Sequence, residues 1–166
     1  SRTNKPDKEF ISSDLNDLFE NAKQDLAEII LEKKAQITSD ALPKATVIVF
    51  QIQQLFSNLL SNSLKYSQEE TVPIINVNYS KVKASEEPDL IKASKNFYHK
   101  IAFTDNGIGF DQKYADQIFH LFSRLHNKKE YSGTGVGLSI CKKIVINHQG
   151  FIFAKGEINI GATFTI

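Results

Sequence analysis

Two short glycine-rich segments constrain the fold of this 166-residue chain more than any other feature. The first, residues 105–109 (DNGIG), comes directly after the strand-like pattern of residues 97–104. The second, residues 133–137 (GTGVG), leads into a segment whose apolar residues recur at helical spacing. Glycines allow a positive φ and a close approach of the backbone to a ligand, and the free N–H groups of a helix N-terminus attract phosphate. The fold must therefore place one glycine turn at a strand end and another at a helix start.

The rest of the chain alternates between helix and strand patterns. Apolar residues at three- and four-residue steps predict helices at about 14–30, 51–66 and 137–148. Alternating apolar and polar residues predict strands at 35–40, 75–80, 97–104, 151–155 and 162–166. A short strand could begin at Phe10, and the polar residues 83–96 are predicted to form a hairpin connection. Elements mixed in this way predict an α+β fold with the form of a two-layer α/β sandwich.

Composition excludes several classes of protein. The balance of 20 Lys+Arg against 19 Asp+Glu argues against a nucleic-acid surface. The longest apolar stretch, residues 45–50, is far shorter than the roughly 20 residues of a membrane helix, and no signal peptide is evident. The single cysteine, Cys141, excludes an internal disulfide framework, and we expect it to face the core. We therefore expect a cytoplasmic domain with no nucleic-acid partner and no direct membrane contact.

A polar stripe runs along the predicted helix at 51–66. Asn58, Asn62 and Lys65 stand at i, i+4 and i+7, so they share one face beside the leucine stripe. Taken alone, such a stripe is more typical of a solvated helix surface. The alternative is a face for Mg²⁺ and phosphate, because an amide oxygen is a hard ligand that suits Mg²⁺.

The glycine-rich segments leave alternatives open when each is taken alone. DNGIG is also typical of a common Asp-Asn-Gly turn, although Asp105 could accept a hydrogen bond from an exocyclic amine. GTGVG could be a flexible loop that caps a helix. It is not a Walker loop, because no Lys-Ser/Thr pair follows it at the required spacing. It is not a Rossmann fingerprint either, because no strand directly precedes it.

Taken in order, the motifs resemble those of the ATP-binding catalytic domain of sensor histidine kinases, in the GHKL superfamily of gyrase, chaperone and mismatch-repair ATPases. The matching segments are the asparagine box at 58–66, the glycine boxes at 105–110 and 133–138, the phenylalanine box at 118–125 and the G-x-T-F element at 161–164. The resemblance implies a Bergerat fold over residues 10–166, in which helices cover one face of a mixed, mostly antiparallel sheet. Residues 1–9 would be the remnant of a linker from an upstream dimerisation hairpin.

The resemblance also implies roles for individual residues. Asn62 would ligate Mg²⁺, Asn58 would support the phosphate side of the site, and Arg124 would reach the terminal phosphate, so these three are the predicted catalytic residues. Asp105 would recognise the adenine amino group, with Thr163 beside it through a water. Residues 126–132 would form the ATP lid, with Lys128 and Lys129 as phosphate neighbours. The other predicted ATP contacts are Lys65, Tyr66, Gly107, Gly109, Gly133, Thr134, Gly135, Val136, Gly137 and Leu138.

Departures from the family pattern help to distinguish phosphoryl transfer from ATP hydrolysis as the predicted reaction. In the gyrase and chaperone branches a glutamate stands one helical turn before the metal-binding asparagine and activates water, whereas this chain has Asn58 there. General-base help is typically worth about 10²–10⁴-fold, so its absence favours phosphoryl transfer to a protein over hydrolysis. Ser63 stands where alanine is usual and Ala162 where serine is frequent; both are small, and we expect no functional consequence.

No histidine here is followed by Asp or Glu, as the phosphoacceptor histidine of the family is. We therefore predict a two-component transferase domain that binds Mg-ATP and donates the γ-phosphate to a histidine on a separate hairpin, for relay to the receiver domain of a response regulator. We also predict that the fragment is monomeric. Two alternatives are a regulatory nucleotide-binding module without kinase output and a protein-serine kinase of the anti-sigma type.

Overall fold

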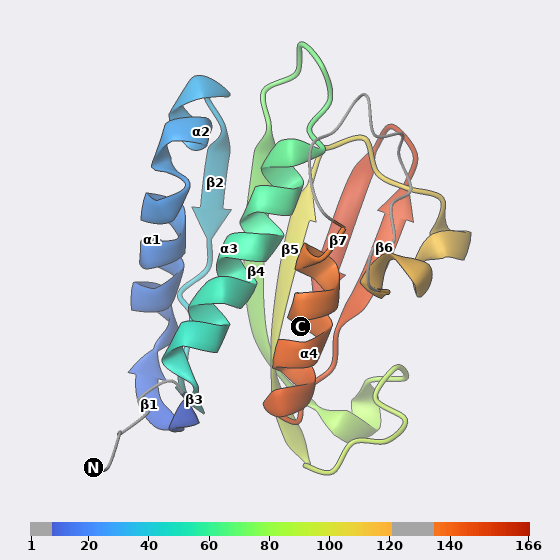
Figure 1. The fold of residues 1–166 in the computed structure, drawn as a ribbon. Helices are drawn as coiled ribbons and strands as arrows, with labels where there is room; N and C mark the ends of the chain where they lie inside the picture. Colours follow the sequence, from blue (N-terminus) through green and yellow to red (C-terminus); the bar gives the residue numbers. More distant parts are fainter. Residues whose placement is uncertain (1–7, 121–134) are drawn as a thin grey trace.

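The computed structural model describes residues 8–120 and 135–166, which form two layers (Figure 1). One layer is a five-stranded sheet in the order β2-β4-β5-β7-β6. Its strands are β2 (Gln36–Ser39), β4 (Ile74–Lys83), β5 (Phe97–Asp105), β6 (Phe153–Glu157) and β7 (Gly161–Thr165). The β2–β4 pair is parallel and the other three pairs are antiparallel. The predicted α+β sandwich with a mixed, mostly antiparallel sheet is confirmed.

The second layer consists of helices on one face of the sheet (Figure 1). They are α1 (Leu15–Asp25), α2 (Ala27–Glu32), α3 (Val49–Lys65) and α4 (Gly137–Asn147). A two-stranded ribbon of β1 (Ile11–Asp14) and β3 (Lys44–Val47) flanks α1, and 3-10 turns occupy Ala84–Glu86, Gln112–Tyr114 and Gln117–Phe119. Of the helices described, none combines the length and the apolar character needed to cross a membrane.

Helix boundaries follow local chemistry at some points and depart from the predictions at others. Asp14 caps α1 as expected, because its carboxylate accepts the N–H of Asn16 at 2.9 Å. The predicted helix at 14–30 is in fact two helices, since Leu26 leaves helical geometry at φ −109° and ψ 11°. Strand β3 was not predicted, because residues 45–50 read only as an apolar run.

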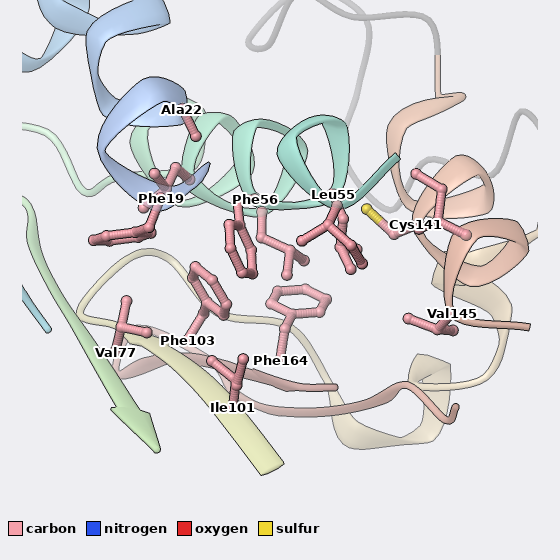
Figure 2. Close-up of a cluster of buried hydrophobic side chains, with 14 of the residues drawn as sticks. Phe19, Ala22, Leu55, Phe56, Val77, Ile101, Phe103, Cys141, Val145 and Phe164 are labelled. Carbon is pink, nitrogen blue, oxygen red and sulfur yellow. The ribbon is translucent and has the colours of Figure 1, made fainter. Parts of the chain in front are cut away.

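The core lies between the sheet and the helices (Figure 2). Phe19 of α1, Phe56 of α3 and Phe103 of β5 meet with ring centroids 5.8–6.3 Å apart. Cys141 of α4 is buried as expected, and burial raises the pKa of its thiol to about 12, so the thiol stays protonated at neutral pH. The buried stripe of α3 consists of Ile52, Leu55, Phe56, Leu59, Leu60, Ser63 and Leu64.

Because that stripe faces the core, only the other side chains of α3 are accessible to a ligand. Asn58 and Asn62 lie on the flank of the helix and are half-buried. The end of β5 brings Asp105 to the C-terminal half of α3, and the start of α4 lies beside Asn58. The packing therefore gathers the asparagine box and both glycine segments at one end of the domain.

Candidate functional site

Asp105, the last residue of β5, is held by three hydrogen bonds. Its Oδ1 accepts the backbone N–H of Gly107 at 2.9 Å and that of Ala162 at 3.1 Å. Its Oδ2 accepts the hydroxyl of Ser63 at 2.8 Å. Burial raises the pKa of Asp105, while the three hydrogen bonds act in the opposite direction. Because a carboxylate oxygen accepts two hydrogen bonds, Oδ1 is filled by the protein and Oδ2 can accept one more donor.

The turn after Asp105 packs between the C-terminal end of α3 and the β6–β7 turn. The N–H of Ile108 donates to the carbonyl of Tyr66 at 2.9 Å, and the carbonyl of Ile108 accepts the N–H of Asn159 at 2.8 Å. A Cβ at Gly107 would come within 2.5 Å of the Tyr66 carbonyl oxygen. Gly109 has φ +61°, and a Cβ there would overlap the Glu157 carbonyl. Glycine is therefore required at both positions for this packing.

The Gln68 side chain hydrogen-bonds to the same turn, a role that was not predicted from the sequence. Its Nε2 donates to the carbonyls of Asn106, Gly107 and Asn159 at 2.9–3.1 Å. The side chain thus joins the end of α3, the first glycine turn and the β6–β7 turn. Its place two residues after the asparagine box was the only indication in the sequence.

Asn58 and Asn62 place two side-chain amides on the half-buried flank of α3. Asn58 Nδ2 donates to the carbonyl of Gly137 at a long 3.4 Å, and the same side chain hydrogen-bonds with the Cys141 thiol. The side-chain amide of Asn62 has no hydrogen-bond partner among the residues described. The same residues contain no cluster of three His, Cys, Asp or Glu side chains able to hold a metal. A cation here would be bound by amide, phosphate and water oxygens, a donor set that fits Mg²⁺.

Lys65 and Tyr66 lie at the end of α3, next to the turn. The Lys65 ammonium lies 4.8 Å from the centroid of the Tyr66 ring, a cation–π contact. Both side chains are half-buried. Their predicted contacts with phosphate or ribose remain a prediction.

The second glycine segment is described from Gly135 onward. Gly135 has φ +72°, and α4 begins at Gly137 without a side-chain cap. The first N–H groups of α4 therefore receive no side-chain cap from the residues that the structure describes, which suits a phosphate ligand. Val136 and Leu138 are half-buried beside this turn. Arg124, Gly133, Thr134 and the predicted lid at 126–132 lie outside the described residues.

Thr163 is not brought to Asp105. Its Oγ1 lies 3.0 Å from Oγ1 of Thr104, its cross-strand partner. Since neighbouring strand residues face opposite sides of a sheet, Thr163 lies on the face away from buried Ala162 and Phe164. The backbone of Ala162 makes the contact with the Asp105 carboxylate instead.

Comparison with known proteins gives a family match over most of the chain. The family described as "Histidine kinase-, DNA gyrase B-, and HSP90-like ATPase" matches residues 48–166. Cyanobacterial phytochrome A of Nostoc sp. is 37% identical over 93% of this chain and 18% of its own length. Sensor protein RprX of Bacteroides fragilis is 30% identical over 92% of the chain and 28% of its own length. The chain thus spans less than a third of these relatives.

Solved structures share the fold at low sequence identity. The nucleotide-free catalytic domain of histidine kinase ThkA matches with a TM-score of 0.71 and 21% identity, over 95% of this chain and 93% of its own. Full-length ShkA in complex with AMPPNP matches with a TM-score of 0.72 and 18% identity, over 94% of this chain and 30% of its own.

Proposed function

Because the chain belongs to the histidine kinase-, DNA gyrase B- and HSP90-like ATPase family, we propose that it binds Mg-ATP and donates the γ-phosphate to a histidine on a separate helical hairpin. The nucleotide would lie between α3, the 105–109 turn and the start of α4. The phosphoryl group would then pass to the receiver domain of a response regulator in a cytoplasmic two-component pathway.

The observation that carries the proposal is the hydrogen bonding of Asp105. Oδ1 is occupied by two backbone N–H groups, whereas Oδ2 has one protein donor, the Ser63 hydroxyl. An exocyclic purine amine is a donor that would complete Oδ2. The carboxylate is rigidly placed because its donors come from α3, the turn and β7, so it would select the amine by position.

Phosphate binding is supported at the other side of the site. The Asn62 amide is free of hydrogen bonds within the described part of the chain, so its oxygen can serve as a ligand without breaking another contact. The uncapped N–H groups at the start of α4 would bind phosphate oxygens. Mg²⁺, when bound, neutralises charge on the phosphates. Arg124 is proposed to reach the terminal phosphate.

Transfer is favoured over hydrolysis by the residue one turn before Asn62. Asn58 carries a neutral amide, which has no useful basicity, so it cannot take a proton from water. Catalysis by this domain would therefore rest on holding the phosphates and aligning the acceptor. A regulatory module without kinase output is disfavoured because the asparagine and glycine residues of the motifs are all present.

A phosphotransfer assay tests the proposal. The domain is mixed with γ-labelled ATP, Mg²⁺ and a separately prepared dimerisation hairpin of the parent protein. We expect acid-labile label on the hairpin and none on the domain alone. Label on the domain itself would contradict the proposed acceptor, and ATP binding without any transfer would favour the regulatory module.

A further inference from the structure

The side chain of Gln68 lies where three backbone carbonyls from two turns converge. The carbonyls of Asn106 and Gly107 belong to the turn after β5, and that of Asn159 belongs to the turn between β6 and β7. All three oxygens lie 2.9–3.1 Å from Nε2 of Gln68. Because only the nitrogen of a carboxamide donates hydrogen bonds, these acceptors fix which way the Gln68 amide faces. The half-buried side chain therefore joins the two turns through a single donor group.

Without this donor the three carbonyls would repel one another. Their oxygens carry partial negative charge and face the same point, and a part-buried acceptor that loses its donor costs free energy. The two turns would move apart until water reached these oxygens. The position of the first glycine turn thus depends on a side-chain donor at residue 68 as well as on backbone hydrogen bonds.

The β6–β7 turn depends on the same donor. Asn159 has φ +62°, a left-handed conformation that is unfavourable for most residues with a side chain. Its N–H donates to the carbonyl of Ile108 at 2.8 Å, and its carbonyl accepts the Gln68 amide at 3.1 Å. Both backbone groups of Asn159 are therefore bound to its neighbours, so loss of the Gln68 donor would loosen both turns together.

Gly107 connects Gln68 to the carboxylate of Asp105. The Gly107 N–H donates to Oδ1 of Asp105 at 2.9 Å, and the Gly107 carbonyl accepts the Gln68 amide at 3.1 Å. Because the Gly107 N–H helps to place the carboxylate, movement of Gly107 would change the direction in which Oδ2 of Asp105 faces. Within the described part of the chain, the Gln68 side chain makes no hydrogen bond to Asn58, Asn62 or α4. Its influence is therefore directed to the base side of the proposed site and not to the phosphate side.

We propose that Gln68 is a positioning residue for the adenine base, because it holds the first glycine turn in its base-binding form before a nucleotide arrives. The inference rests on the proposed ATP site and extends it to a residue outside the asparagine and glycine boxes. A ligand that needs a fractionally populated form of a protein binds more weakly by that fraction. If the turn kept this form about a tenth of the time without Gln68, ATP would bind about tenfold more weakly. A nucleotide without an amine for Asp105 would lose less, because it gains less from a fixed carboxylate.

The test removes the donor and leaves the size of the side chain nearly unchanged. Gln68→Met keeps the length without a donor, and Gln68→Glu turns a carboxylate oxygen toward the three carbonyls. Gln112→Met is the matched control, because the Gln112 amide also bridges to backbone groups, those of strand β6, at 2.9 and 3.3 Å. Calorimetry measures the affinities for ATP and for inosine triphosphate, which lacks the exocyclic amine, at a temperature at which circular dichroism shows every variant folded. Amide exchange of Ile108, whose N–H donates to the Tyr66 carbonyl, is measured by NMR without nucleotide.

We expect both Gln68 variants to bind ATP about tenfold more weakly or worse, with a smaller loss for inosine triphosphate. The amide of Ile108 should exchange faster in both, because the turn that carries it opens more often. Gln112→Met should keep the parental preference for ATP and the parental exchange of Ile108.

The outcomes separate this inference from the proposed function. If the parent prefers ATP and the Gln68 variants keep its affinities, or lose affinity for both nucleotides equally, the inference is overturned and the proposed ATP site stands. Unchanged exchange of the Ile108 amide, or an equal loss of preference in Gln112→Met, overturns it as well. A parent that does not prefer ATP overturns the proposed adenine contact and this inference with it.

Discussion

The hydroxyl of Ser63 donates a 2.8 Å hydrogen bond to Oδ2 of Asp105, across the boundary between α3 and β5. Ser63 is 2% exposed, so water cannot easily replace it. The bond links the helix that carries Asn58 and Asn62 to the carboxylate proposed to recognise adenine. Ser63 stands where the family usually has alanine, and the expectation that it is without consequence overlooked this contact.

Replacing Ser63 by alanine should raise the pKa of Asp105 further. Burial already raises that pKa, and the Ser63 hydrogen bond lowers it by favouring the charged carboxylate. NMR titration of the Asp105 carboxyl group in both proteins measures the effect. An unchanged or lower pKa in Ser63→Ala would show that the hydroxyl does not stabilise the charge.

The sign of the pH dependence follows from the same shift. A carboxyl group whose folded pKa is raised contributes most to stability below its unfolded value, near 3.8, and loses that contribution as the pH rises through the folded pKa. Because Ser63→Ala raises the folded pKa further, its stability deficit against the parent should widen across that window as pH increases. Urea denaturation at several pH values measures the deficit, and a deficit that narrows would contradict this account.

Asn62→Ala should remove the Mg²⁺ dependence of ATP binding. The Asn62 side-chain amide has no hydrogen-bond partner among the described residues, and its loss would take a ligand from the cation. Titration with a non-hydrolysable ATP analogue, with and without Mg²⁺, measures the dependence. Asn21→Ala on the exposed face of α1 is the matched control and should retain it. The assignment fails if Asn62→Ala binds the analogue with the parental Mg²⁺ response.

Asn58→Glu should increase ATP hydrolysis, because it places a basic carboxylate one turn before Asn62 in the position that the gyrase branch uses. The gain should not exceed the range of about 10²–10⁴-fold typical of general-base help. Phosphate release under single-turnover conditions measures it, with Asn58→Gln as a control of similar size that lacks basicity. Equal hydrolysis by the Glu and Gln variants would show that the missing base does not limit the reaction.

Gly109→Ala should destabilise the fold by about 2 kcal/mol or more, since a positive φ and an overlap with the Glu157 carbonyl both oppose a side chain there. Gly137→Ala is the matched control, because its Cβ would meet no atom of the described residues within 4 Å. That control should unfold at the same urea concentration or a higher one. A Gly109→Ala variant as stable as its parent would show that the turn can move away from β6.

Local patterns predicted most elements, although they missed the break at Leu26 and strand β3, and they did not specify the side-chain contacts between distant segments. The leucine stripe predicted α3, and the motifs predicted that both glycine segments flank one site. The bonds of Ser63 and Gln68 to the first glycine turn depend on how α3 lies against β5, which periodicity does not specify. The resemblance implied Thr163 beside Asp105, whereas in the sheet Thr163 is paired with Thr104 and its hydroxyl lies 3.0 Å from the Thr104 hydroxyl.

Binding of adenosine triphosphate and inosine triphosphate tests the central claim most directly, since inosine lacks the exocyclic amine that Asp105 is proposed to accept. Calorimetry should show that the parent domain binds ATP about ten- to a hundredfold more tightly, as expected for a hydrogen bond to a charged group. In Asp105→Asn this preference should disappear, because its amide nitrogen would face the amine donor to donor. Equal affinity of the parent domain for both nucleotides would contradict the account.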